Sequence, residues 1–293
     1  MFQRRKVLLT LLDACGGELT STDMQKLLFC YCMDTARPHF DFFPHKFGCF
    51  SFLSYQDKRV LTSQGYLANV EGFKLRKPGR YMRMAGEESI GIRLFAERME
   101  GLRGRDLVRK VYLSHPYYAT RSRIKHEILD SKELATVEAH SCSDTKRLLF
   151  TIGYEGLTID SFINKLIKRN VAMVVDVRRN PLSMKYGFSK TRLGHYLQRA
   201  DIKYEHIPSL GIESALRQNL KSEKDYTALF KRYAATWLPQ RGAEIARVEQ
   251  LLADNRRIAL TCFESDARMC HRHKITERLA ASNRWNTPVE HIA

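Results

Sequence analysis

The amino-acid sequence predicts an α/β protein: a mainly helical winged helix-turn-helix domain followed by a parallel-sheet, Rossmann-like sandwich. The first half of the chain carries apolar residues at helical spacing and then a short basic segment around a Pro-Gly turn. The second half alternates short, continuous apolar runs with amphipathic stretches, which is the pattern of buried parallel strands joined by crossover helices. With 293 residues, the chain is long enough for two such domains.

Charge is the unusual feature of the composition. The chain has 49 lysines and arginines against 32 aspartates and glutamates, a formal net charge of +17, and both halves contain the excess. This balance is typical of proteins that bind a polyanion, so DNA is the expected partner. The seven cysteines include no C-x-x-C pair and no apolar run is long enough to cross a membrane. We therefore expect a cytoplasmic protein with no membrane partner and no cofactor, and the sequence leaves a homodimer open.

The first 65 residues predict three helices. Residues 7–12 form an apolar stripe that ends at Gly16-Gly17, where glycine permits the left-handed backbone of a helix end. A second helix is expected to start after Thr20-Ser21, because the Ser21 hydroxyl can cap free N–H groups. After an aromatic-rich segment at residues 40–52, a third helix covers about residues 53–65.

Residues 66–84 predict two short strands around the turn Lys77-Pro78-Gly79. Five basic residues occur here with no acid among them: Lys74, Arg76, Lys77, Arg80 and Arg83. Three helices followed by a basic ribbon is the order of a winged helix-turn-helix, so this ribbon or the third helix is expected to contact DNA phosphates. The alternative is a dimerisation or docking module of the same shape. This domain is expected to span residues 1–84.

Two segments of this domain carry a resemblance to a known family. They are Gln25–Phe29 and Phe43–Gly48 with Phe50-Ser51, while Cys49 stands where the family typically has a proline. Over about residues 4–70, the chain resembles the N-terminal helical domain of Panacea-type antitoxins and related phage or mobile-element proteins. The resemblance implies a helical N-terminal domain of that kind.

Residues 85–147 predict a helical connector. One apolar stripe includes Ile90, Leu94, Phe95 and Met99, and a second stripe over residues 107–112 ends before a proline. The polar stretch Ser141–Asp144 is the expected domain boundary. From there, residues 148–293 predict the α/β domain.

Three buried strands are predicted in the α/β domain, at residues 148–152, 173–175 and 257–261. Amphipathic helices are predicted over about residues 159–167 and 271–280. Each predicted strand is followed by polar residues, and the carboxyl ends of parallel strands share one edge of a sheet, where ligands bind. The sequence therefore predicts a site at this edge. Its candidate catalytic residues are Glu264, Glu155 and Asp176. The candidate substrate-binding or phosphate-binding residues are Tyr154, Arg178, Ser183, Lys190, Cys270, His271 and Arg272.

The same segments resemble a known family. The motifs are Thr151–Glu155, Asp176–Arg178 with Pro181 and Ser183, Phe188–Lys190, Tyr204, Leu210-Gly211, Cys262–Glu264 and Cys270–Arg272. Over about residues 148–285, the chain resembles the family known as domain of unknown function 488. Similar domains occur near DNA-modification and phage-defence genes, so the resemblance implies chemistry on nucleic acid.

The residues fit cleavage of the N-glycosidic bond of a base, modified or not, in DNA. This reaction needs a carboxylate that stabilises an oxocarbenium-like sugar or activates water, and we expect Glu264 in this role. Glu155 or Asp176 is the expected second acid. Arg178 and Arg272 are expected to hold phosphates, and Tyr154 to stack on an extruded base.

Three alternatives remain. In a metal-dependent nuclease, Glu155, Asp176 and Glu264 hold Mg²⁺ through carboxylate oxygens. Cysteine chemistry is a second alternative, because Cys262 to Arg268 matches the C-x5-R spacing of thiol phosphatase loops, although this loop has acids and no glycine. The third is a DNA-binding regulator or sensor that binds a nucleotide or modified base without turning it over.

Overall fold

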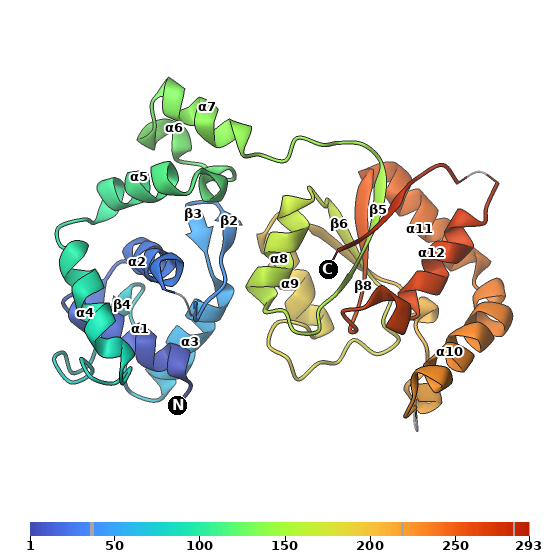
Figure 1. Cartoon of the computed structure of the whole chain (residues 1–293), viewed down its shortest axis with the longest axis horizontal. Helices are drawn as coiled ribbons and strands as arrows, with labels where there is room; N and C mark the ends of the chain where they lie inside the picture. Colours follow the sequence, from blue (N-terminus) through green and yellow to red (C-terminus); the bar gives the residue numbers. More distant parts are fainter. Residues whose placement is uncertain (36–37, 218–219, 284, 293) are drawn as a thin grey trace. The chain divides into compact units, whose positions relative to one another are not determined.

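The computed structural model describes residues 1–35, 38–217, 220–283 and 285–292 (Figure 1). Its contacts divide the chain into two compact units, Met1–Ser141 and Cys142–Ala293. The division falls at the start of the polar stretch Ser141–Asp144. No helix in the described ranges is both long and apolar enough to cross a lipid bilayer.

The first unit is mainly helical. Helices α1 (Gln3–Ala14), α2 (Ser21–Asp34) and α3 (Phe52–Ser63) correspond to the three predicted helices. The N-terminus of α2 is capped by Thr20 and not by the expected Ser21, because Thr20 Oγ1 accepts a hydrogen bond from Asp23 N at 3.0 Å while Ser21 Oγ donates to the carbonyl of Glu71. Two short antiparallel pairs accompany the helices. They are β1 (Glu18–Leu19) with β4 (Phe73–Lys74), and β2 (Phe43–His45) with β3 (Gly48–Phe50).

The prediction of two strands around the turn Lys77-Pro78-Gly79 is wrong, because the turn between the paired residues lies earlier in the chain. The antiparallel bridge joins Leu67 to Leu75, and Ala68 N donates to Lys74 O at 2.8 Å, so the chain turns before Lys74. The later Pro-Gly turn is held by another group. Asp13, which is buried at the end of α1, accepts hydrogen bonds from Gly79 N at 2.6 Å and Tyr81 N at 2.7 Å. These bonds fix the basic segment against α1 instead of pairing it as a second strand.

Residues 85–141, within the predicted connector, form four α-helices of the first unit. These are α4 (Glu88–Arg98), α5 (Gly104–Ser114), α6 (Lys125–Ile128) and α7 (Ser131–Ala139). Helix α4 packs on α1, and α5 packs on α2. The apolar stripe predicted for α4 is partly wrong, because Ile90 and Leu94 are 61% and 60% exposed while Ile92 and Phe95 are buried.

The second unit is an α/β sandwich around a five-stranded parallel sheet, as predicted. The sheet order is β7-β6-β8-β5-β9. The strands are β5 (Leu148–Gly153), β6 (Met173–Asp176), β7 (Lys203–His206), β8 (Arg257–Cys262) and β9 (Val289–Ile292). Figure 1 shows α8 (Ile159–Lys168) and α9 (Lys190–Arg199) on one face of the sheet, and α11 (Gly242–Asn255) and α12 (Arg272–Ala280) on the other. Helix α10 (Glu223–Arg232) contributes Leu229 and Phe230 to the core with α11 and α12.

The sequence predicts the three central strands and misses the two at the edges. Strands β5, β6 and β8 are buried on both faces, so they are continuous apolar runs. Strand β7 is only half-buried and β9 contains Glu290 and His291, so neither forms such a run. The core between the sheet, α11 and α12 takes alternate residues of β8: Ile258, Leu260 and Cys262.

Candidate functional site

The carboxyl ends of the three central strands meet at one edge of the sheet, as the sequence predicts. Gly153 pairs with Cys262, and Asp176 pairs with Thr261. The loop after β8 passes over the end of β5 so closely that a Cβ atom at Gly153 would lie 1.7 Å from the carbonyl oxygen of Glu264. Gly211 has a similar role, because a Cβ there would lie 2.0 Å from Arg179 N. Two glycines therefore permit the loops to converge at this edge.

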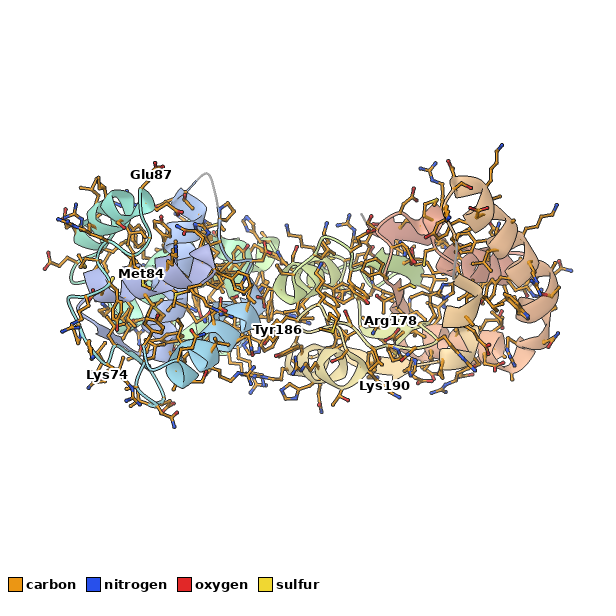
Figure 2. All side chains as sticks on the ribbon, turned by 90° about the horizontal axis from the view of Figure 1, so that it is seen from below. Lys74, Met84, Glu87, Arg178, Tyr186 and Lys190 are labelled. Atoms are coloured by element: carbon orange, nitrogen blue, oxygen red, sulfur yellow. The ribbon has the colours of Figure 1, made fainter. Side chains whose placement is uncertain are left out.

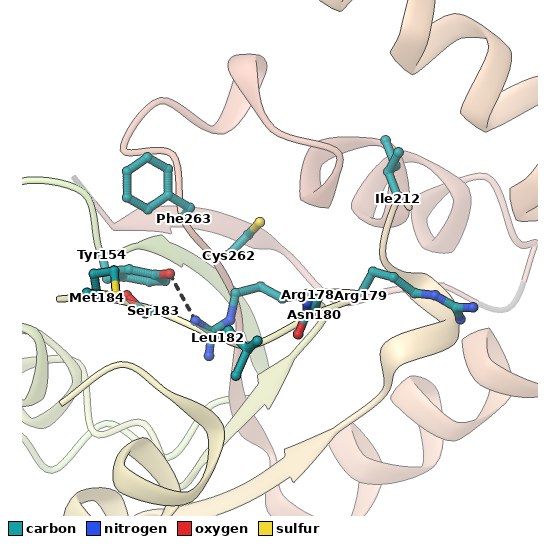
Figure 3. A pocket seen from close by; sticks show the side chains of 10 residues that line it. All are labelled: Tyr154, Arg178, Arg179, Asn180, Leu182, Ser183, Met184, Ile212, Cys262 and Phe263. Atoms are coloured by element: carbon teal, nitrogen blue, oxygen red, sulfur yellow. Dashed lines mark hydrogen bonds between the residues drawn. The ribbon is translucent and has the colours of Figure 1, made fainter. Parts of the chain in front are cut away.

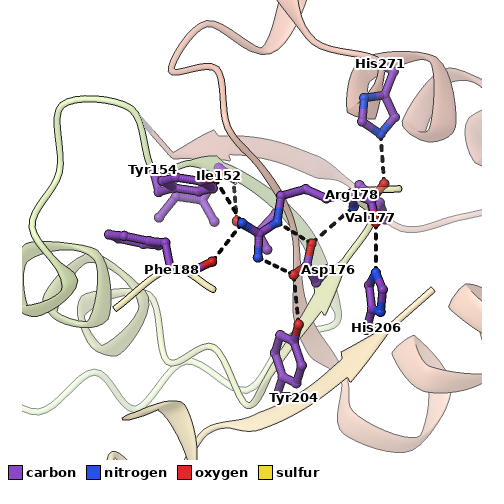
Figure 4. A network of polar contacts seen from close by, with 10 residues as sticks. Ile152, Tyr154, Asp176, Val177, Arg178, Phe188, Tyr204, His206 and His271 are labelled. Atoms are coloured by element: carbon purple, nitrogen blue, oxygen red, sulfur yellow. Dashed lines mark hydrogen bonds and ion pairs between the residues drawn. The ribbon is translucent and has the colours of Figure 1, made fainter. Parts of the chain in front are cut away.

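Arg178 is the centre of a buried polar network (Figure 4). Its Nε donates to Asp176 Oδ1 at 2.8 Å, and its Nη2 donates to Asp176 Oδ2 at 2.5 Å. Its Nη1 donates to Tyr154 Oη at 2.9 Å and to the carbonyl of Phe188 at 2.8 Å. Burial lowers the pKa of Arg178, but the hydrogen bonds and charge of Asp176 outweigh this effect and raise it above its ordinary value. Arg178 thus holds the strand ends together, and these contacts argue against the expected role as a phosphate clamp.

The Asp176 carboxylate is fully buried, and its oxygens are occupied. Besides Arg178, Tyr204 Oη donates to its Oδ2 at 2.8 Å. Burial, followed by the negative charge of Asp176, raises the pKa of Tyr204, so the phenol remains a donor. A carboxylate with this set of partners is not free to activate water. These contacts argue against the expected role of Asp176 as a catalytic acid.

A cavity of about 350 Å³ opens beside this network (Figure 3). Its lining residues are Tyr154, Arg178, Arg179, Asn180, Leu182, Ser183, Met184, Ile212, Cys262 and Phe263. Three apolar side chains of this set are exposed to solvent: Leu182, Met184 and Phe263. The pocket therefore combines arginines from the end of β6 with an apolar, aromatic wall.

The two aromatic side chains that line the pocket, Tyr154 and Phe263, differ in their exposure to solvent. Tyr154 is buried, and its ring stacks on Phe188 with centroids 4.3 Å apart and an interplanar angle of 9°. Phe263 meets Tyr154 edge to face at 5.3 Å and keeps 44% of its surface exposed. Phe263 is thus the better stacking surface for a ligand. Sequence reasoning missed it, because exposure of one aromatic residue after a strand has no signature in the sequence.

The other two candidate acids lie on the loops that follow β5 and β8. Glu155 Oε2 accepts hydrogen bonds from Ser265 N at 3.0 Å and Ser265 Oγ at 3.1 Å, which tie the two loops together. Glu264 is half-buried, and Cys262 Sγ donates to its Oε2 at 3.4 Å. Neither carboxylate lines the pocket itself, but Glu264 directly follows two residues that do.

Arg272 is almost fully buried and supports the loop after β8. Its Nη1 donates to the carbonyl of Glu264 at 2.5 Å, and its Nη2 donates to the carbonyl of Ser265 at 2.9 Å. Its Nε donates to Thr151 Oγ1 at 3.3 Å. These bonds argue against the expected phosphate contact by Arg272. They assign it a positioning role for Phe263 and Glu264.

Two cysteines and a histidine gather behind the pocket. Cys262 lies at the end of β8, and Cys270 and His271 directly precede α12. All three are buried, and His271 Nδ1 is 3.8 Å from each sulfur. Burial, hydrogen bonding with Cys262 and the charge of Glu264 raise the pKa of the Cys270 thiol well above its ordinary value. Burial of Cys270 and His271 argues against the expected direct contact with a phosphate.

The remaining candidates of the second unit are nearer the surface. Ser183 lines the pocket, and its Oγ accepts from Lys185 N at 3.2 Å. Lys190 is exposed at the first turn of α9 (Figure 2). Arg268 is 89% exposed and pairs with Asp266 at 3.2 Å. Because Arg268 is exposed and paired with Asp266 while Cys262 is buried, the geometry argues against the C-x5-R alternative.

The five candidate DNA-binding residues of the first unit are exposed, and Figure 2 labels Lys74 among them. Lys74 pairs with Glu18 at 2.6 Å, and Arg76 Nε donates to the carbonyl of Leu67 at 3.2 Å. Among the described residues, Lys77, Arg80 and Arg83 form no ion pair with an acid. These three side chains are the available cations of the segment.

Within the described part of the chain, Glu155, Asp176 and Glu264 do not form a group close enough to share an ion. The arrangement therefore offers an arginine-lined, aromatic pocket with one nearby carboxylate. No curated protein and no solved structure matches the chain. The model of one family, described as "Domain of unknown function DUF488", matches residues 158–279, which lie within the second unit.

Proposed function

We propose that the protein binds DNA through the basic segment of its first unit and takes a nucleobase into the pocket of its second unit. The observation that carries this proposal is the pocket at the carboxyl ends of β5, β6 and β8, where exposed Phe263 and the half-exposed side chain of Arg179 line one cavity. A flat base stacks on an aromatic ring, and a guanidinium donates to its edge or to a phosphate.

The first unit supports the DNA-binding part of the proposal. After α1, α2 and α3, an isolated antiparallel bridge joins Leu67 to Leu75, and this order of three helices and a short turn-back is the part that resembles a winged helix-turn-helix domain. Lys77, Arg80 and Arg83 are exposed on the segment that Asp13 fixes. Cations held in one place neutralise phosphates at a smaller entropic cost than mobile cations do.

The reaction that fits the pocket is hydrolysis of an N-glycosidic bond. Water adds to the sugar C1′, the bond to the base breaks, and the base leaves with a proton, so that an abasic site remains. Glu264 is the proposed carboxylate, because Arg272 fixes its backbone beside the pocket. The nuclease alternative is weaker, because the separate partners of Asp176 and Glu155 leave no shared site for Mg²⁺.

The DNA-binding part is tested with Lys77→Ala, Arg80→Ala and Arg83→Ala in one chain. If each cation releases counterions from one phosphate, the slope of log affinity against log salt decreases by about 2.7. Fluorescence anisotropy with a labelled duplex at several salt concentrations measures this slope. The matched control removes three exposed cations elsewhere in the unit, Arg93, Lys110 and Lys132, and is expected to keep the slope. Equal effects of the two triple variants would refute binding by the basic segment.

The pocket is tested with an abasic-site assay on duplex and single-stranded DNA with and without base modifications. Glu264→Gln is expected to abolish product, and Phe263→Ala to weaken binding of the base by about 1–3 kcal/mol. Glu249→Gln, an exposed glutamate of α11, is the matched control. Intact DNA in every reaction would rule out the hydrolase.

One observation favours a second candidate. Only Glu264 among the three predicted acids remains beside the pocket, and a site with one carboxylate suits binding without turnover. In the assay above, ligand binding that depends on Phe263 and forms no product would identify a sensor of a nucleotide or modified base.

A further inference from the structure

We propose that Cys262, Cys270 and His271 form a binding site for a thiophilic divalent metal ion, with Zn²⁺ as the best match. Two thiol sulfurs and one imidazole nitrogen lie within 4.8 Å of one another. This is the ligand set Cys₂His, which binds zinc and leaves one position for water or substrate. Soft sulfur ligands disfavour Mg²⁺, so this site differs from the carboxylate site of a nuclease.

The distances fit an ion between the three side chains. His271 Nδ1 lies 3.8 Å from Cys262 Sγ and 3.8 Å from Cys270 Sγ. With Zn–S bonds of about 2.3 Å and a Zn–N bond of about 2.1 Å, a tetrahedral site separates sulfur from nitrogen by about 3.6 Å. Small rotamer adjustments are therefore enough to accommodate the ion.

The histidine is already oriented for a metal. His271 Nε2 is 3.0 Å from the carbonyl of Val177, and only a protonated nitrogen bonds to a carbonyl oxygen (Figure 4). The proton on Nε2 leaves the Nδ1 lone pair directed at the two sulfurs. A hydrogen bond from the second ring nitrogen to a backbone carbonyl is the usual support of a metal-binding histidine.

The surrounding structure fixes the other ligands. Cys262 ends the central strand β8, and Arg272 holds the loop between the cysteines through the carbonyls of Glu264 and Ser265. The ring of Tyr233 packs edge to face on His271 at 5.8 Å, while its hydroxyl donates to the carbonyl of Leu210 at 2.7 Å. The ligands are thus held by regular structure and by buried neighbours, which favours a preformed site.

The pocket gives the site a route to solvent. Cys262 is one of the residues that line the cavity, and Glu264 Oε2 is 3.4 Å from its sulfur. The fourth position of a bound ion is therefore open to the Glu264 carboxylate or to a water molecule from the pocket. This inference goes beyond the proposed function and does not depend on it, because metal binding is measured without DNA.

The test uses the full chain, purified with a reductant, stripped with a chelator and then titrated with ZnCl₂ or CoCl₂. We expect about one Zn²⁺ per chain after gel filtration, measured by mass spectrometry of the metal, and a sulfur-to-cobalt charge-transfer band with Co²⁺. Cys262→Ser, Cys270→Ser and His271→Gln are each expected to lose the bound metal. Cys142→Ser is the matched control, because Cys142 is an exposed free cysteine outside the cluster.

Three results would overturn the proposal. The first is a folded chain that binds no Zn²⁺ and gives no thiolate band. The second is full metal content in the three cluster variants, because the ion then binds elsewhere. The third is a Cys262–Cys270 disulfide as the product of mild oxidation without any metal uptake. If the serine variants do not fold, the Co²⁺ spectrum of the unchanged chain still decides, because its charge-transfer intensity counts the thiolate ligands.

Discussion

Asp13 in the first unit and Asp176 in the second are both buried carboxylates, but they bind different groups. In the first unit, Asp13 accepts backbone N–H groups of Gly79 and Tyr81 and leaves nearby cations at the surface. In the second, Asp176 accepts the guanidinium of Arg178 itself. An acid that binds the backbone shapes a basic surface, whereas an acid that binds the side chain converts an arginine into internal support. The number of arginines near an acid therefore does not identify a binding site.

Asp176→Asn is expected to have the largest effect, because it leaves the buried Arg178 without its charged partner. Loss of one member of a buried pair costs about 3–5 kcal/mol. Urea unfolding followed by circular dichroism measures the loss. Asp254→Asn, at an exposed position of α11, is the control. If the free energy of unfolding equals that of the control, Arg178 does not depend on Asp176 for its buried position, and the role of Asp176 as its charged partner is refuted.

Tyr204→Phe removes one hydrogen-bond donor to Asp176 and keeps the ion pair of Asp176 with Arg178. The Asp176 carboxylate loses the bond from Tyr204 Oη, and a hydrogen bond to a charged group contributes about 1.5–3 kcal/mol. The same unfolding experiment measures this change. Tyr226→Phe, in α10, serves as the control, because no hydrogen bond of its hydroxyl supports the network. A loss as large as that of Asp176→Asn would show that the network fails as a unit.

Asp13→Asn tests the first unit. An asparagine keeps one acceptor oxygen and places a donor against the second N–H group, at a cost of about 1–3 kcal/mol. We expect weaker DNA binding in the anisotropy assay, although no cation has changed. Asp34→Asn, an exposed acid that pairs with Arg98, is the control. Unchanged DNA affinity despite reduced stability would separate Asp13 from the proposed binding surface.

The sequence predicts those parts of the fold in which local pattern and burial agree. Runs such as residues 148–152 and 173–175 are apolar because both faces of the strand are covered. The ribbon after α3 is misplaced, because the deciding bonds come from Asp13, more than 60 residues earlier. Tertiary contacts of this kind leave no periodic signal.

The location of the candidate site can be predicted from the sequence, but the roles of its individual residues cannot. The strand ends meet as expected, since parallel strands share their direction. Burial decides what each side chain does there, and a sequence does not give burial for Asp176, Arg178 or Arg272. The cluster of Cys262 with Cys270 and His271 escaped prediction because its spacing is not that of a zinc motif and only the fold brings the strand end to the helix start.

The close approach of the chain at Gly153 distinguishes related sequences that can keep the same loop after β8 from those that cannot. Any side chain at this position collides with the carbonyl of Glu264, and the backbone there has no room to move while Arg272 holds the same carbonyl. A chain of the same fold that carries alanine or a larger residue at this point must route the loop after β8 differently. Glycine at this position is therefore a one-letter marker for chains in which residues 262–264 keep the arrangement described here.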